Sequence, residues 1–223
     1  MRAIGPSLGA FGIADPLADP VLDLHASDGS LISMNDNWKD SQQSEIEASG
    51  FQPQNDLESA IIRTLDPGSY TAVVSGKDGG TGVGLVEGYD LDQAADSQFG
   101  NISTRGFVET GTNVMIGGFI LGGESGNAKV VVRALGPSLS AFGVNGALTD
   151  PMLELHDENG ALVQSNDNWK ETQQTEIEAT GLQPTNDLES AVSGTLAPGA
   201  YTAIVAGNSD LTGVGLVEVY RLP

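Results

Sequence analysis

Cysteine is absent from this chain of 223 residues, so the sequence offers neither disulfide bonds nor thiolate ligands for a metal. Basic residues are scarce as well, since nine Lys and Arg stand against 30 Asp and Glu and the formal net charge is -21. Such a charge repels the phosphates of nucleic acids and anionic lipid headgroups, so we expect neither a nucleic acid nor a membrane as partner. No apolar run approaches the roughly 20 residues of a membrane-spanning helix. No apolar stretch follows Met1 to Pro6, so we expect no signal peptide within this sequence and, if the protein is secreted, a leader outside it.

A long internal repeat organises what the chain does contain. Residues 2–92 recur at residues 133–223 with a constant offset of 131 and no gap, and about 55 of the 91 positions are identical. This period exceeds the ~20 to 50 residues of solenoid repeats and corresponds to one whole small domain. We therefore expect two tandem domains.

The local patterns favour strands and turns. Thirty Gly, ten Pro and short runs rich in Val, Ile, Thr and Tyr are typical of an all-β protein. One short helix is expected at residues 41–48, with Asp40 or Ser41 as its N-cap and Gly50 at its end, and its copy at residues 172–180. Each repeat predicts a hairpin of strands 21–25 and 31–34, a second hairpin of strands 59–65 and 70–74 around the turn at residues 66–68, and a closing strand at residues 83–89.

The segment between the repeats occurs once. It predicts three further strands at residues 102–108, 113–121 and 129–133. The expected organisation is a first β-sandwich repeat at 1–92 that lacks its first strands, connecting strands at 93–132 that complete a sandwich, and a second repeat at 133–223. Either residues 93–132 fold back onto the first repeat, or a neighbouring chain supplies the missing strand to its open edge.

We expect apolar strand positions shared by the repeats to line both cores. In the first repeat these are Leu22, Leu24, Ile46, Leu57, Ala60, Leu65, Tyr70, Ala72, Val74 and Leu85, each with its copy 131 residues further on.

Four motifs in the second repeat resemble a known family. They are Asp150 to Leu155, Asn166 to Asn168, Leu188 to Ala191, and Leu196 to Val205 with its Pro-Gly-x-Tyr-Thr strand entry. Together they resemble the bacterial pre-peptidase C-terminal domain, a small jelly-roll β-sandwich appended to secreted enzymes and surface proteins. The whole 131-residue unit also resembles modules repeated in large secreted bacterial proteins. The resemblance implies two tandem jelly-roll-like antiparallel β-sandwiches and an extracellular or cell-surface location, although the helical insertion is longer than usual for the family and no protease domain accompanies the module.

One hydrolase-like motif is weighed and rejected. Gly5-Pro6-Ser7-Leu8-Gly9 matches the G-x-S-x-G pattern of serine hydrolases, with His25 as a conceivable base. That elbow needs a strand, a strained turn and a helix, which Pro6 and the following glycines do not favour, and the copy has Ser140 in place of the second Gly. His25 and His156 have no neighbouring His or Cys, which favours a structural or exposed role. We therefore predict no catalytic residues and no enzymatic activity.

Acidic and amide side chains at two loop-strand junctions raise the possibility of calcium binding. Hard oxygen ligands are what Ca²⁺ prefers, although Asn and Asp are also the commonest turn formers and no EF-hand loop is present. No other cofactor is expected. The candidate ligands are Asp36, Asn37, Asp56 and Glu58, with their copies Asp167, Asn168, Asp187 and Glu189.

Two further residue types stand out in each repeat. Trp38 and Trp169 are either partly buried packing residues or platforms on which a sugar stacks. Arg2 and Arg133 are expected to pair with Glu58 and Glu189.

Taken together, the sequence predicts a non-enzymatic extracellular module that is structural or adhesive. Head-to-tail self-association into a surface filament is one expectation, because a heterologous contact does not close on itself. The alternative is a carbohydrate- or protein-binding accessory module of a secreted hydrolase, whose partner would be a glycan or a surface protein.

Overall fold

The chain forms two compact units in the computed structural model, which describes residues 1–92, 98–122 and 126–222. The first unit is Met1–Gln98 and the second is Phe99–Pro223. Residues 93–97 and 123–125 of the predicted connecting segment lie outside the described residues.

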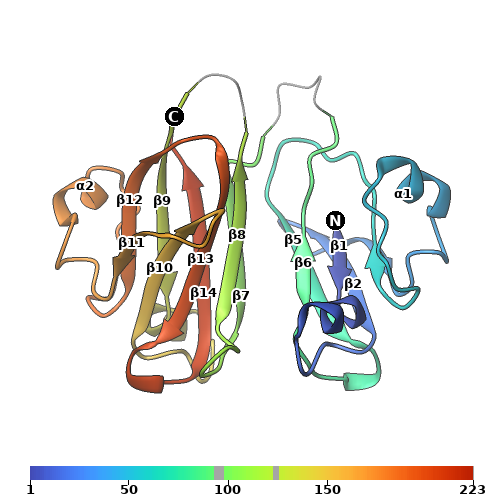
Figure 1. Cartoon of the computed structure of the whole chain (residues 1–223), viewed down its shortest axis with the longest axis horizontal. Coiled ribbons are helices and arrows are strands. Elements are labelled where there is room, and N and C mark those ends of the chain that lie inside the picture. The colour runs from blue at the N-terminus through green and yellow to red at the C-terminus, as the bar shows by residue number, and fades with distance from the viewer. Residues whose placement is uncertain (93–97, 123–125, 223) are drawn as a thin grey trace. The chain divides into compact units, whose positions relative to one another are not determined.

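The second unit is a sandwich of two four-stranded antiparallel sheets (Figure 1). One sheet has the order β12-β9-β14-β7 and the other has the order β11-β10-β13-β8. Counted within the unit, these are the first, eighth, third and sixth strands facing the second, seventh, fourth and fifth, which is the jelly-roll arrangement. The strands are Asn101–Val108 (β7), Met115–Leu121 (β8), Ala128–Leu135 (β9), Pro151–Asp157 (β10), Leu162–Asn166 (β11), Ser190–Leu196 (β12), Gly199–Gly207 (β13) and Gly213–Arg221 (β14).

Alternation of apolar and polar residues decides which side chains fill this sandwich. In β10, Leu153 and Leu155 are fully buried while Glu154 between them is exposed, as the period of two in a strand requires. The core of the second unit draws on both sheets and includes Val108, Met115, Phe119, Val130, Val132, Ala134, Val192, Leu196, Ala203, Val205, Val217 and Val219.

The first unit repeats six of these eight strands. Its sheets have the orders β4-β1-β6 and β3-β2-β5, and β1 to β6 correspond to β9 to β14 at the offset of 131. Within residues 1–92 no strand corresponds to β7 or β8. The strands are Arg2–Ile4 (β1), Pro20–Ala26 (β2), Leu31–Asn35 (β3), Ser59–Ala60 (β4), Tyr70–Gly76 (β5) and Leu85–Glu87 (β6).

The short helix of each repeat lies outside the sheets and is anchored by one apolar side chain. Helix α1 spans Gln43–Ser49 and α2 spans Gln174–Glu178 (Figure 1). Helix α1 buries Ile46, and α2 buries Ile177 against Trp169 and Ala191. The predicted N-cap is wrong, because α1 begins after Gln42, whose backbone has a positive φ of 54° and whose side chain makes no cap. Instead, Gln42 Nε2 donates to the carbonyl of Ile62 at 2.9 Å and ties the helix start to the strand region behind it. Gly50 does end α1 in the left-handed conformation, with φ 77°.

The all-β prediction and the tandem sandwich prediction are confirmed, but one predicted hairpin is wrong. Strands β2 and β3 do form a hairpin, as do β10 and β11. The strands on either side of the turn at residues 66–68 belong to different sheets, as β12 and β13 do in the second unit. Local pattern identified these strands correctly but could not assign them to sheets.

Several predicted core residues prove to be exposed. Leu57 and Leu188 are 45% and 47% exposed, because the neighbouring Glu58 and Glu189 turn inward in their place. Leu65, Tyr70 and Leu85 are also exposed in the first unit. No described helix has the length and apolar character of a membrane span.

Candidate functional site

The first unit is open along one side of its sandwich. Among the described residues, β5 pairs only with β2 and β6 pairs only with β1, so each sheet ends in an unpaired edge. We call these two edges, together with the inward-facing side chains beside them, the open side. Unpaired strand edges present rows of backbone N–H and C=O groups that can accept another strand.

The same side is closed in the second unit by two consecutive strands. Strand β7 pairs with β14 from Gly213↔Val108 to Tyr220↔Asn101, and β8 pairs with β13 from Gly199↔Leu121 to Val205↔Met115. The two strands lie in facing sheets rather than pairing with each other, and the turn between them is held by Glu109 N donating to Asn113 O at 3.0 Å. We call residues 101–121 the β7–β8 arch.

The arch fills the space between the sheets as well as pairing with their edges. Val108, Met115 and Phe119 are buried in the core, and the Phe119 ring stacks on Tyr201 with centroids 5.5 Å apart. Packing is tight enough that a Cβ atom at Gly117 would lie 2.9 Å from Val217 Cγ1. A Cβ atom at Gly215 would lie 3.0 Å from Val108 Cγ2.

Equivalent residues that face this space are identical in the two units but differ in burial. Leu65 is 38% exposed whereas its copy Leu196 is 6% exposed. Ala72, Val74 and Val86 are half-buried in the first unit, while their copies Ala203, Val205 and Val217 are buried. Because the side chains are the same, the difference in burial comes from the arch that one unit has and the other lacks.

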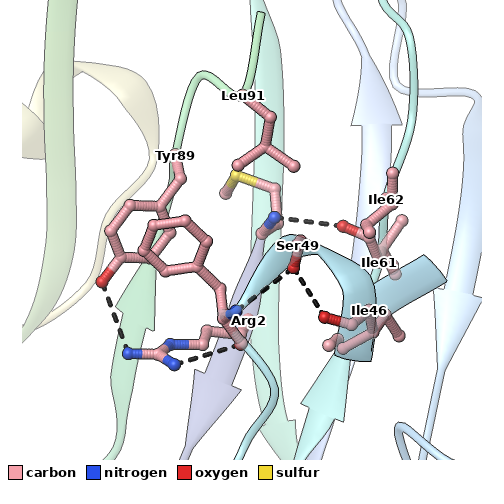
Figure 2. A pocket seen from close by; sticks show the side chains of 10 residues that line it. Arg2, Ile46, Ser49, Ile61, Ile62, Tyr89 and Leu91 are labelled. Carbon is pink, nitrogen blue, oxygen red and sulfur yellow. Dashed lines mark hydrogen bonds between the residues drawn. The ribbon is translucent and has the colours of Figure 1, made fainter. Parts of the chain in front are cut away.

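A cluster of polar residues around Arg2 closes one end of the first unit. Arg2 Nε donates to Glu87 at 2.5 Å. Arg2 Nη1 donates to the Phe51 carbonyl at 3.1 Å, and Nη2 donates to the Tyr89 hydroxyl at 3.4 Å (Figure 2). Burial and then the hydrogen bond to Glu87 raise the pKa of Tyr89, so the phenol stays protonated and donates to Glu87 at 2.8 Å.

The cavity beside this cluster is lined by Tyr89, Ile46, Ile61 and neighbouring side chains (Figure 2). Its volume is about 20 Å³, which suits about one water molecule rather than a ligand.

The predicted partner of Arg2 is therefore wrong. Arg2 pairs with Glu87 and Arg133 pairs with Glu218, not with Glu58 and Glu189. The reason is register, since Arg2 lies directly opposite Glu87 on the adjacent strand and Arg133 lies opposite Glu218. The identical strand positions of Glu87-x-Tyr89 and Glu218-x-Tyr220 could have indicated this partner from sequence, and we missed that signal.

Glu58 is fully buried and holds the chain that follows β1. Its carboxylate accepts hydrogen bonds from Gly5 N at 3.1 Å, Ser7 N at 2.9 Å, Ser7 Oγ at 2.9 Å and Asn55 N at 3.1 Å. These bonds fix the entry to the 3₁₀ helix Pro6–Phe11. Glu189 holds the 3₁₀ helix Pro137–Phe142 in the same way.

The other predicted calcium ligands are spread over separate polar contacts. Asp56 pairs with Lys39 at 2.6 Å and Asp187 pairs with Lys170 at 2.5 Å, while the amides of Asn37 and Asn168 donate to Asp40 and Glu171. Within the described residues no three His, Cys, Asp or Glu side chains converge as a metal site would need.

Asp36 and Asp167 have different partners in the two units. Lys77, at the start of the 3₁₀ turn Lys77–Gly79, places its Nζ 2.6 Å from Asp36 and 3.8 Å from Asp19. The copy of Lys77 is Asn208, in the turn Asn208–Asp210, whose amide lies 3.2 Å from Asp150 and 3.3 Å from Asp167. Burial, then the charges of Asp150 and Glu171, raise the pKa of Asp167.

The remaining candidates have structural contacts. The Ser7 hydroxyl donates to Glu58, and the His25 ring bonds the Gly29 carbonyl at 3.1 Å, so the structure does not couple them as a nucleophile and its base. Trp38 and Trp169 are each only 4% exposed and donate from Nε1 to the carbonyls of Asn55 and Asn186. Buried indoles of this kind leave no flat face for a sugar.

Comparison with known proteins gives little beyond this geometry. No family model matches the chain. No curated protein matches it either. Among solved structures, the chain is similar to the pre-peptidase C-terminal domain of a collagenase from Bacillus anthracis, with 13% sequence identity and a TM-score of 0.34, over 53% of this chain and 88% of that chain.

Proposed function

We propose that this chain is a non-enzymatic structural or adhesive repeat module that works by assembling with other polypeptides outside the cell. The observation that carries the proposal is the open side of the first unit, where the sandwich that is closed in the second unit lacks two strands. The extracellular location is proposed from the resemblance of the repeats to a domain family of secreted and surface proteins.

The composition of the open edges supports assembly rather than a solitary module. Strand β5 carries no charged residue, and β6 carries only Glu87, which is paired with Arg2. Natural edge strands that must stay unpaired are commonly protected by charges, prolines or bulges. Val73 on β5 and Leu85 on β6 are exposed instead.

Head-to-tail association is the form of assembly that we propose. The open side belongs to one unit only, so a contact made through it joins unlike surfaces and propagates into a fibre rather than closing as a dimer. Light scattering after size-exclusion chromatography and negative-stain microscopy, both over a range of protein concentrations, test this. Species that grow with concentration are expected, and a monodisperse particle of 23.0 kDa at every concentration would contradict the proposal.

A further inference from the structure

The second unit shows what kind of partner the open side of the first unit fits. Unlike an ordinary sheet edge, the open side has two edges at once, one from each sheet, and in the second unit one continuous segment pairs with both equivalent edges and packs between the sheets. From this correspondence we infer that the open side binds a β-arch with the pattern of residues 101–121, supplied by a polypeptide segment outside residues 1–92. The inference rests on the proposed assembly role and specifies its partner.

Five residues that face the arch in the second unit recur in the first, whereas Val219, which pairs with Ile102, has Gly88 as its copy. Tyr201, Ala203, Val205, Gly215 and Val217 face the arch, and their copies are Tyr70, Ala72, Val74, Gly84 and Val86. A partner that suits one set of side chains therefore suits the other.

Gly84 gives the most specific support. At Gly215 a Cβ atom would meet the Val108 side chain of the arch at 3.0 Å, so a side chain there would press on the bound strand and Val108 would have to give way. At Gly84 the nearest atom to such a Cβ is Leu17 Cδ2 at 3.5 Å, which is an ordinary contact. The described residues of the first unit leave ordinary space for a Cβ atom at this position, whereas an arch bound on the open side would crowd it.

The partner must also be free of its own sandwich. Val108, Met115 and Phe119 fill the core of the second unit and are at most 6% exposed, so the arch of a second copy can enter the open side only after it has left its own sandwich. The partner is consequently an arch-forming segment that is not already packed, with a small residue opposite Val86, as Gly117 lies opposite Val217.

A synthetic peptide of residues 99–122, labelled with a fluorophore, is the direct probe. We expect saturable binding of one peptide per chain, and slower hydrogen exchange in residues 68–74 and 82–89 of the first unit. A scrambled peptide is the negative control. A peptide that carries Phe119→Ala should bind more weakly, because it loses the ring that would stack on Tyr70.

Gly84→Val on the full chain tests the site. A side chain at this position should weaken peptide binding at least about tenfold, as overpacking would, without lowering the unfolding midpoint of the first unit. Absence of saturable binding, or binding that Gly84→Val leaves unchanged, would overturn the inference. If the chain binds no peptide but still self-associates when it carries Gly84→Val, the open side docks edge to edge with a second copy. That result would refute this inference and leave the proposed function standing.

A covalent fusion of the arch to the first unit makes the test independent of the solubility of the peptide. Residues 101–131 placed directly before Met1 reproduce the spacing of the second unit, since residue 132 corresponds to residue 1. The first unit of this extended chain should unfold at a higher temperature, close to that of the second unit. An unchanged midpoint, followed by Trp38 fluorescence in a Trp169→Phe background, would contradict the inference.

Discussion

At the scale of single residues, Glu58 and Glu189 show how a buried charge can organise a loop. Each carboxylate receives four hydrogen bonds, three of them from backbone N–H groups and one from a serine hydroxyl. Replacing Glu189 with Gln keeps the size but turns an acceptor oxygen into an amide that faces backbone donors. We expect a loss of roughly 3 kcal/mol in the stability of the second unit.

Chemical denaturation followed by Trp169 fluorescence, in a Trp38→Phe background, measures this loss. The exposed Glu158, changed to Gln, is the control and should leave the midpoint unchanged. An equal midpoint for the two variants would show that the carboxylate is not needed to hold the 3₁₀ turn.

The exchange of Lys77 for Asn208 makes a second prediction about the carboxylates. Because burial and neighbouring charges raise the pKa of Asp167 above its ordinary 3.8, its protonated form stabilises the folded second unit. That stabilisation is complete below the unfolded pKa and is lost as the pH rises through the folded pKa. Asn208→Lys should therefore raise the melting temperature of the second unit at neutral pH, and less so in acid.

Lys77→Asn is the matched variant in the first unit, where the hydrogen bond to Asp36 raises the pKa of Lys77. It should lower the melting temperature of the first unit at neutral pH. Opposite signs for the two variants are the expected pattern, and a lowered melting temperature in Asn208→Lys would contradict it.

Calcium binding stays a prediction from sequence. The presence of Asn208 where the first unit has Lys77 makes the second unit the more suitable place for it. Asp150 Oδ1 and Asn168 Oδ1 are buried without a hydrogen-bond partner among the described residues, as are their copies Asp19 Oδ1 and Asn37 Oδ1. The units differ in that no described ammonium group lies beside Asp167 as Lys77 lies beside Asp36. We expect millimolar Ca²⁺ to raise the melting temperature of the second unit, with a gain in stability of about 2.7 kcal/mol at a hundredfold excess over Kd. Asn208→Lys should abolish the response. Melting curves that coincide in EDTA and in Ca²⁺ would contradict calcium binding and would mean that the Asn and Asp side chains of these loops only cap their own turns.

At the scale of strands, Val86 and Val217 are the same residue in two surroundings. Val217 is buried against the arch, whereas Val86 is half-buried beside the open side. Val217→Ala should cost about 2 kcal/mol in the stability of its unit, and Val86→Ala less than half as much. Denaturation followed by the tryptophan of each unit measures both, and equal losses would mean that the first unit is covered in solution.

Local pattern predicted these strands well but not everything that they do. The alternation of apolar and polar residues predicted β2 and β3 correctly, and Gly50 predicted the end of α1. Leu57 was expected inside but is exposed, and Glu58 is buried in its place, because the Glu58 carboxylate accepts hydrogen bonds from backbone N–H groups elsewhere in the chain. A pattern of hydrophobic residues cannot predict such bonds. The open side could be predicted because residues 93–132 occur only once in the sequence. How far the side chains beside it are exposed could not be predicted. Identical residues such as Leu65 and Leu196 differ only through strands elsewhere in the chain.

At the scale of the whole molecule, the described part of residues 93–132 does not fold back onto the first repeat, which is one of the two alternatives that the sequence leaves open. Strands β7, β8 and β9 all pair within the second unit, with β14, β13 and β12. A neighbouring polypeptide as a source of strands for the first unit stays a prediction. The two units differ because one copy of the sandwich is closed and the other is open. Assembly would therefore protect the backbone amides of the open unit from hydrogen exchange.

Hydrogen exchange at two protein concentrations tests this central claim most directly. In dilute solution, amides on the free edges of β5 and β6 should exchange rapidly, while those of β13 and β14 stay protected by the arch. At high concentration, β5 and β6 should gain protection as partners cover them. Equal and concentration-independent protection of the two pairs of strands would contradict the account, because the first unit would then have no open side.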